Sequence, residues 1–143
     1  NNGDLIATLS EYPWLRTGIL DEVNKIALSP DGQTLASGGA DSTIKMWHLG
    51  AKDLIDIMHK HNGMVRCVAF TADGRMLVTG GDDRKLQFRD MTERQVIMTL
   101  SLDDTAAHSL IHSQNAKTLV TGSYRKIKVW SISTDEEISC INV

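Results

Sequence analysis

SPDGQTLASGG, the stretch at residues 29–39, decides the fold because it returns twice further along the chain. TADGRMLVTGG occupies residues 71–81 and SQNAKTLVTGS occupies residues 113–123, so the motif starts every 42 residues. Equivalent leucines and glycines fall in register in the three copies: Leu35, Leu77 and Leu119, and Gly38, Gly80 and Gly122. A fixed period between about 20 and 50 residues is typical of repeat architectures. The chain therefore consists of three copies of one structural unit.

Each copy contains four short segments that are rich in Val, Ile, Leu and Thr and are separated by turn residues such as Pro30-Asp31-Gly32. Such segments are typical of β-strands, and no helical periodicity of useful length competes with them. We name them strands a to d in chain order. In the first copy they begin at Val23, Thr34, Thr43 and Leu54. The sequence therefore predicts an all-β chain.

A four-stranded unit that repeats every 42 residues is typical of the antiparallel blades of a β-propeller. The predicted blades span residues 23–58, 65–100 and 107–143, and residues 5–9 are expected to form an extra outer strand of type d. Three blades and one strand do not close a ring, since propellers usually have about 4 to 8 blades. We therefore expect an incomplete ring, completed either by further blades of a longer polypeptide or by self-association.

The segments TIKMWHL (residues 43–49) and KIKVWSI (residues 126–132) resemble the strand that ends in Trp-Asp in the WD-repeat family. Residues 29–43 are also close to the consensus of that family. The resemblance covers essentially the whole chain, although no copy keeps the full Trp-Asp dipeptide. It implies a propeller that serves as a non-catalytic platform for partner proteins or peptides.

The resemblance also implies a buried hydrogen-bond tetrad in each blade. Its members are a His before strand a, a Ser or Thr in strand b, an Asp in the b–c turn and the Trp of strand c, which satisfy one another's polar groups away from water. The matching residues are Ser37, Asp41 and Trp47 in the first copy, His61, Thr79 and Asp83 in the second, and Thr121 and Trp130 in the third. Ile19, Arg89 and Asp103 stand where other members are expected, and the third b–c turn is shorter. We therefore expect looser blades than the consensus would give.

An insertion before the first strand a carries Tyr12, Trp14 and Arg16. A long loop with Tyr, Trp and Arg on a rigid scaffold has the composition of an interface hot spot. The alternative is that Trp14 folds back and packs against a neighbouring blade. The resemblance implies that the d–a and b–c connections form the top face of a propeller, where partners bind. That implication adds Arg66, Arg84, Tyr124 and Arg125 to the expected binding residues.

No set of residues points clearly to catalysis or to a metal. His59 and His61 could share one face of a strand and bind a metal, but a third ligand is not evident and the resemblance places His61 in the tetrad. The acid pairs at residues 82–83 and 103–104 lie at predicted turns, where Asp side chains cap the backbone. The paired glycines are not followed by the Lys and helix of a phosphate-binding loop. We therefore expect no catalytic residue, no metal site and no cofactor.

Composition excludes several classes of protein. The chain has 143 residues, with 15 Lys+Arg against 18 Asp+Glu and a formal net charge of −3, which argues against a nucleic-acid binder. Its apolar runs are far shorter than the roughly 18 to 20 residues needed to span a bilayer, and residues 1–30 lack the pattern of a signal peptide. Cys67 and Cys140 match neither a metal-ligand spacing nor a disulfide framework, which favours a reduced, cytoplasmic protein.

The expected function is protein–protein interaction or sensing within a larger signalling or assembly protein. The alternative is that the blades are the regulatory propeller of a larger enzyme, such as a signalling ATPase or a protein kinase, whose catalytic domain lies outside these residues. A phosphate-binding loop or kinase motifs in adjoining sequence would distinguish the two hypotheses.

Overall fold

The computed structural model describes residues 3–5, 7–9, 22–59, 61–102, 105–113, 117–132 and 136–142, with the backbone alone for residues 59 and 136–142. Within these ranges the regular structure consists of twelve β-strands and contains no helix. No helix of the described residues is therefore long and apolar enough to cross a membrane. The all-β fold with propeller-like blades, predicted from the repeat, is confirmed.

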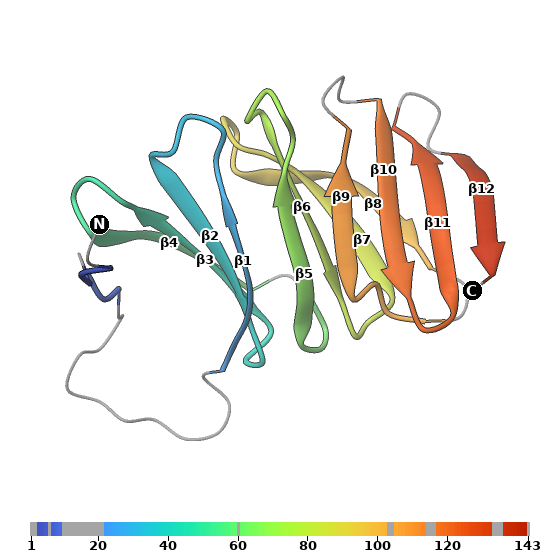
Figure 1. The fold of residues 1–143 in the computed structure, drawn as a ribbon, viewed down its shortest axis with the longest axis horizontal. Coiled ribbons are helices and arrows are strands. Elements are labelled where there is room, and N and C mark those ends of the chain that lie inside the picture. The colour runs from blue at the N-terminus through green and yellow to red at the C-terminus, as the bar shows by residue number, and fades with distance from the viewer. Residues whose placement is uncertain are drawn as a thin grey trace.

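The strands form three antiparallel sheets, in each of which the spatial order follows the chain (Figure 1). The first sheet contains β1 (Val23–Leu28), β2 (Thr34–Gly39), β3 (Thr43–His48) and β4 (Asp53–His59). The second contains β5 (Val65–Phe70), β6 (Met76–Gly81), β7 (Lys85–Asp90) and β8 (Gln95–Ser101). The third contains β9 (Ser109–His112), β10 (Thr118–Ser123), β11 (Lys126–Ser131) and β12 (Glu136–Asn142). Each sheet is thus one blade with strands a to d in order.

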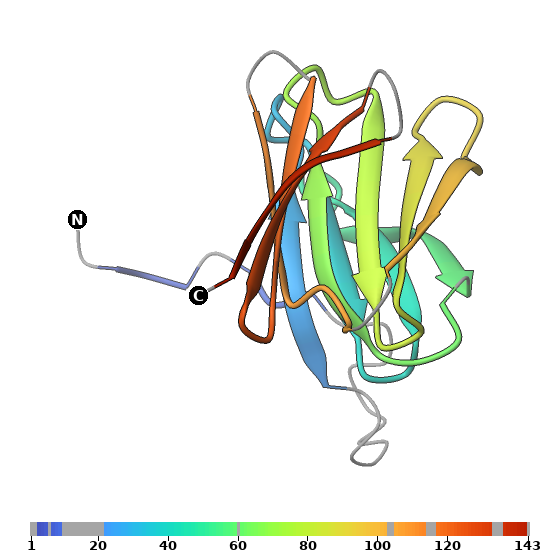
Figure 2. The same cartoon turned by 90° about the vertical axis from the view of Figure 1, so that its right-hand side faces the viewer.

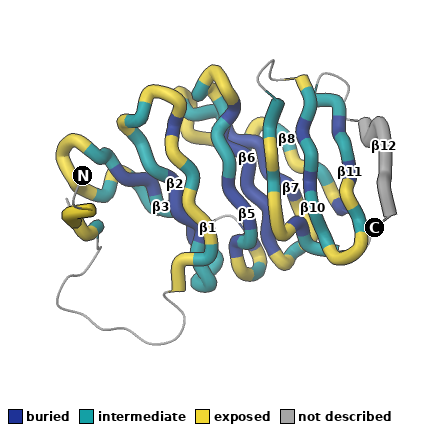
Figure 3. The backbone as a smooth tube through the Cα atoms, viewed as in Figure 1, coloured by how far each residue is buried: buried dark blue, intermediate teal, exposed yellow. Residues whose placement is uncertain are grey.

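The three blades stack face to face, with β5 lying against both β1 and β9 (Figure 2). In the first junction, the face of the first blade packs against that of the second: Ala36, Ile44, Met46 and Met58 against Val65, Val68 and Leu77. In the second junction, side chains of the second blade pack against the third: Cys67, Val78, Leu86 and Phe88 against Ala107, Leu119 and Trp130. Figure 3 shows the buried residues concentrated where sheets meet and the exposed ones at the turns.

Glycine in strand b allows the blades to approach closely. A Cβ atom built on Gly38 would lie 2.5 Å from Cγ1 of Val65, on strand a of the second blade. A Cβ atom on Gly80 would lie 2.7 Å from Sγ of Cys67 and 3.3 Å from Cβ of Ala107, which precedes strand a of the third blade. Two of the glycines that revealed the repeat, Gly38 and Gly80, therefore leave room for the next blade.

The turns between strands a and b are built alike in the first two blades. The carboxylate of Asp31 accepts a hydrogen bond of 3.0 Å from the backbone N–H of Gln33, and Asp73 accepts one of the same length from Arg75. These Asx turns close the hairpins at the residues that the turn chemistry predicted.

Residues 5 and 7–9, which are expected to belong to an extra strand of type d, are not in a strand of the structure, and that strand stays a prediction. A strand d needs the free edge of a strand c. The strands c of the three blades, β3, β7 and β11, already pair with β4, β8 and β12. Within the described residues no strand c therefore has a free edge, so an extra strand d would have to pair with a blade outside these three.

Apolar side chains are exposed on the two outermost sheet faces. Val23 and Ile26 on β1 are 59% and 63% exposed, whereas their repeat equivalents Val65 and Val68 are buried in the first junction. On the third blade, Ile127 is 36% exposed, although its equivalents in both inner junctions are completely buried. We call these the two end faces.

Candidate functional site

The second blade holds the most complete polar network. Nδ1 of the buried His61 lies 3.0 Å from both carboxylate oxygens of Asp83, and its Nε2 lies 2.8 Å from Oγ1 of Thr79. Burial raises the pKa of Asp83, but hydrogen bonds from His61 and from the backbone of Asn62 outweigh it, so the pKa lies below its ordinary value. This network ties the d–a connection to the b–c turn.

In the first blade, the residues at the equivalent repeat positions form different hydrogen bonds. Nε1 of Trp47 donates a hydrogen bond of 2.9 Å to Oγ of Ser37. The carboxylate of Asp41 turns to its own hairpin, where it accepts hydrogen bonds from the backbone and hydroxyl of Thr43 at 3.0 and 2.8 Å. Asp41 also lies 3.1 Å from Nζ of Lys45. The position of Ile19, where the family has its His, lies outside the described residues.

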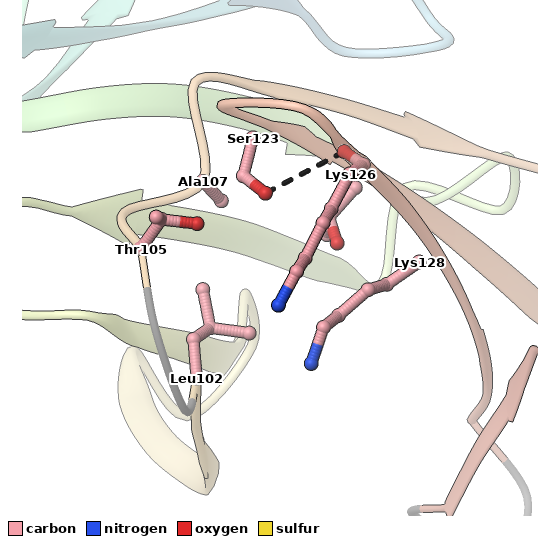
Figure 4. Close-up of a pocket in the computed structure, with 7 residues that line it drawn as sticks. Leu102, Thr105, Ala107, Ser123, Lys126 and Lys128 are labelled. Atoms are coloured by element: carbon pink, nitrogen blue, oxygen red, sulfur yellow. Dashed lines mark hydrogen bonds between the residues drawn. The ribbon is translucent and has the colours of Figure 1, made fainter. Parts of the chain in front are cut away.

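In the third blade, Nε1 of Trp130 donates a hydrogen bond of 3.0 Å to Oγ1 of Thr121. The ammonium group of Lys128 lies 5.4 Å from the centre of the Trp130 ring, a cation–π distance. A cavity of about 10 Å³, at most the room of one water molecule, is lined by Thr121, Lys128 and five neighbours. Figure 4 shows Lys126 and Lys128 entering it side by side toward Leu102. Asp103 lies outside the described residues.

Arg89 stands in strand c of the second blade, where the other two blades have Trp47 and Trp130. Its side chain is completely buried. Nη2 donates a hydrogen bond of 3.3 Å to Oε1 of Gln87, whereas Nε and Nη1 have no acceptor among the described residues. Burial lowers the pKa of Arg89, and the negative charge of Asp56 on β4 opposes that effect.

On the top face, Arg66 and Asp82 form a bidentate ion pair. Nε and Nη2 of Arg66 donate to the two carboxylate oxygens of Asp82 at 2.7 and 2.8 Å. The hydrogen bonds from Arg66 lower the pKa of Asp82, and burial opposes them weakly. Arg66 is the extra residue of a β-bulge, because the register of β5 against β6 shifts between Val65 and Cys67. A bulge of this kind redirects a side chain.

The b–c turns present further cationic and aromatic groups at the same end of the blades. Arg84 and Arg125 hold equivalent turn positions with φ of 60° and 63°, in the left-handed region, and both are exposed. The guanidinium of Arg125 lies 5.7 Å from the centre of the Tyr124 ring, which is 72% exposed. The backbone N–H of Asp82 donates a hydrogen bond of 2.9 Å to the carbonyl of Met64, so the d–a and b–c connections meet.

The structure thus brings together two pairs at this end, Arg66 with Asp82 and Tyr124 with Arg125. Tyr12, Trp14 and Arg16, the other expected binding residues, lie outside the described residues. Asp82, which the sequence predicts only as a turn residue, and the exposed Met64 beside it were not among the expected binding residues. The sequence held no visible sign of the bulge that aims Arg66 at Asp82.

The described residues offer little for covalent chemistry. Among them, no group of three or more His, Cys, Asp or Glu side chains could hold a metal ion. Burial raises the pKa of the Cys67 thiol to about 12, and its Sγ donates to the carbonyl of Ala107 at 3.4 Å. A thiol with such a pKa is a poor nucleophile at neutral pH. The geometry instead presents fixed charged and aromatic side chains at turns.

A comparison with family models completes this picture. The model described as "WD domain, G-beta repeat" matches residues 14–48 and 52–90. The chain belongs to the WD40-repeat family. The match covers the first two repeats, and the third repeat has the same strand order in the structure. The WD40 tetrad is therefore the pattern from which Arg89 and the shortened third turn depart.

Three known proteins are similar to parts of this chain. A periodic tryptophan protein 2 homolog from Dictyostelium discoideum is 27% identical over 81% of the chain and 11% of its own length. Two proteins of Oryza sativa subsp. japonica also match. The U3 snoRNP-associated protein-like YAOH is 37% identical over 34% of the chain and 10% of its own length. The small ribosomal subunit protein RACK1y is 30% identical over 74% of the chain and 31% of its own length. The chain thus spans between a tenth and a third of these relatives.

Proposed function

We propose that this chain forms part of a non-catalytic WD40 platform that binds partner proteins or peptides through its top face. The observation that supports this function most directly is the set of charged and aromatic side chains on the b–c turns and the bulge of β5. The network of His61, Thr79 and Asp83 holds one of these turns in place. The backbone of a turn that is already fixed loses little conformational entropy when a partner binds.

The proposed partner segment carries carboxylates. Arg84 and Arg125 project from turn positions, and no carboxylate of the described residues forms a hydrogen bond or ion pair with either. A guanidinium can bind a carboxylate through two parallel hydrogen bonds, and Tyr124 adds an exposed ring to the same surface. Trp14 and its neighbours in the insertion would enlarge this surface if they act as anchors, as the sequence predicts.

The names of the relatives narrow the search for partners. Two of them are named for ribonucleoprotein particles, one as U3 snoRNP-associated and one as a small ribosomal subunit protein. We therefore infer that proteins of such particles are the partners to test first. With a net charge of −3, contact with protein is favoured over contact with RNA. The cytoplasmic location expected from the cysteines stays a prediction.

The two end faces support a second part of the proposal. Their exposed residues, such as Ile26 and Ile127, repeat residues that are buried in the inner junctions. We infer that each end face packs against another blade, supplied either by a longer polypeptide or by a second copy. Light scattering of the chain over a concentration series distinguishes the two: self-association predicts a discrete multiple of 15.8 kDa, and the alternative predicts none.

The test of the top face is a charge reversal with a matched control. The variant Arg84→Glu with Arg125→Glu should lose capture of ribonucleoprotein-particle proteins by the immobilised chain. The control, Lys52→Glu with Arg75→Glu, changes the net charge equally on exposed turns at the opposite end of the blades and should retain capture. Equal capture by both variants would exclude the top face as the binding surface.

A further inference from the structure

The two junctions between blades are filled differently. In the second junction, a continuous apolar cluster contains the following residues: Phe88, Met98, Leu100, Trp130 and Ile132. The residues at the same repeat positions in the first junction are Met46, Asp56, Met58, Arg89 and Met91. In the first junction, Met46 thus stands in place of Phe88 and Arg89 in place of Trp130. Asp56 stands in place of Met98. The second junction therefore shows how apolar side chains fill the space between two blades of this chain, and the first junction can be compared with it.

The first junction contains a cavity of about 140 Å³ as a result. It is lined by Thr34, Met46, Ile55, Asp56, Met58, Met91 and Arg94, and we call it the Met cleft. Ile55 and Arg94 are exposed, so the cleft opens to solvent. It lies at the bottom face, the end formed by the a–b and c–d turns, because Thr34 follows the first a–b turn and Arg94 belongs to the second c–d turn. An apolar cavity of about 150 Å³ accommodates a benzene ring, so this one has room for one aromatic or branched aliphatic side chain.

Charge at the Met cleft is unbalanced in favour of cations. Asp56 lines the cleft, while Arg94 lies at its mouth. Arg89 lies two residues before Met91, on the same side of the second blade, but it is completely buried and is not part of the lining. Its Nε and Nη1 have no acceptor among the described residues. The guanidinium of Arg94 is open to solvent at the cleft, whereas that of Arg89 lies behind the lining, where the charge of Asp56 acts on it. The two positive charges of Arg89 and Arg94 outnumber the single negative charge of Asp56, so an additional carboxylate at the mouth of the cleft would be stabilised.

We propose that the Met cleft is a second binding site, which takes an extended acidic segment of a partner protein. One aromatic or aliphatic side chain of the segment fills the space that rings occupy in the second junction, and a neighbouring carboxylate pairs with Arg94 at the mouth of the cleft. The site lies at the end of the blades opposite the top face and rests on its own observations. A failure of the top-face proposal therefore leaves it unaffected.

The methionine methyl groups provide the test. Met46, Met58 and Met91 line the cleft, whereas the other three of the six methionines, Met64, Met76 and Met98, do not. The chain with ¹³C-labelled methionine methyls is titrated with the peptide acetyl-Gly-Asp-Phe-Asp-Gly-amide and observed by NMR. Saturable shifts confined to the three cleft methyls, with a Kd of about 1 mM or below, are expected. No saturation below about 10 mM, or equal shifts of all six methyls, would overturn the proposal.

Matched peptides and variants test separately the contribution of the apolar side chain and that of the carboxylates. Replacing Phe by Ala, or both Asp by Lys, should each weaken binding of the peptide at least tenfold. Arg94→Gln, at the exposed mouth of the cleft, should weaken binding of the acidic peptide several-fold without a change in folding. Asp56→Met with Met46→Phe rebuilds the residues of the closed junction and should abolish the shifts. Binding of the lysine peptide as tight as that of the acidic one would contradict the assigned charge preference.

Discussion

Arg66 donates two parallel hydrogen bonds to the carboxylate of Asp82, from Nε at 2.7 Å and from Nη2 at 2.8 Å. This pair joins the bulge of β5 to the b–c turn of the same blade. The side chains of both residues are about one third exposed, at 34% and 36%, so solvent screens the pair. Its role is to fix the direction of two charged groups on the top face more than to stabilise the blade.

The pair makes a prediction about pH. Hydrogen bonds from Arg66 lower the pKa of Asp82 in the folded chain, whereas the unfolded chain has an ordinary value of about 3.9. The pair therefore stabilises the fold fully above pH of about 5, and that contribution is lost as the pH falls through the folded pKa. The titration of the Asp82 carboxyl carbon by NMR should have its midpoint below the ordinary value. Arg66→Gln should raise that midpoint, and an unchanged midpoint would show that the pair is absent in solution.

The network of the second blade predicts a loss of stability. Asp83→Ala removes the acceptor of the buried Nδ1 of His61 and should lower the free energy of unfolding by about 1 to 3 kcal/mol. Asp41→Ala in the first blade is the matched control, because the partners of Asp41 lie in its own, partly exposed hairpin. Its effect should be clearly smaller in urea denaturation. Equal losses for the two variants would mean that His61 gains nothing special from Asp83.

Because the blades approach closely at Gly80, replacing this glycine by Ala is expected to cost more stability than the same change at the equivalent Gly122. Ala at Gly80 places a methyl group 2.7 Å from Sγ of Cys67 and 3.1 Å from Cδ2 of Leu86, inside the second junction. Overpacking there should destabilise the chain by about 1 to 3 kcal/mol in thermal or urea unfolding. At the equivalent Gly122, the closest atom is Oγ of the exposed Ser109, which can rotate away. Gly122→Ala should therefore cost much less, and a reversed order would refute this assignment of the junction.

The regular part of the fold was predictable because repetition and turn chemistry are local. The Asp-Gly turns of the first two copies and the strand-b glycines of all three indicated where the strands of the three blades lie. The pairing of Arg66 with Asp82 was not predictable, because a bulge shifts the register without a distinctive residue. Arg89 was recognisable as a departure from the family pattern. Its consequence needed the structure, since the Met cleft depends on Asp56 from the neighbouring blade.

Replacing Arg84 is expected to weaken partner binding without destabilising the fold. Its φ of 60° lies in the left-handed region, which costs an ordinary residue about 1 kcal/mol and costs Gly almost nothing. Arg84→Gly should leave the free energy of unfolding unchanged or raise it by up to about 1 kcal/mol, while weakening capture of an acidic partner. The two readouts are a melting curve and the same capture assay as for the charge reversal. A large loss of stability would contradict the exposed position of this side chain.

At Arg89, removing a buried charge is expected to stabilise the chain. The guanidinium is completely buried, and two of its nitrogen atoms have no acceptor among the described residues. Replacement of buried ionic groups by apolar side chains of similar size is often neutral or stabilising by about 1 to 4 kcal/mol. Arg89→Met keeps the length of the side chain and removes the unpartnered N–H groups, so we expect the free energy of unfolding in urea to rise by about 1 to 2 kcal/mol. The exposed Arg75→Met is the control and should change it by less than about 0.5 kcal/mol. A drop in stability for Arg89→Met would mean that its guanidinium finds acceptors in solution.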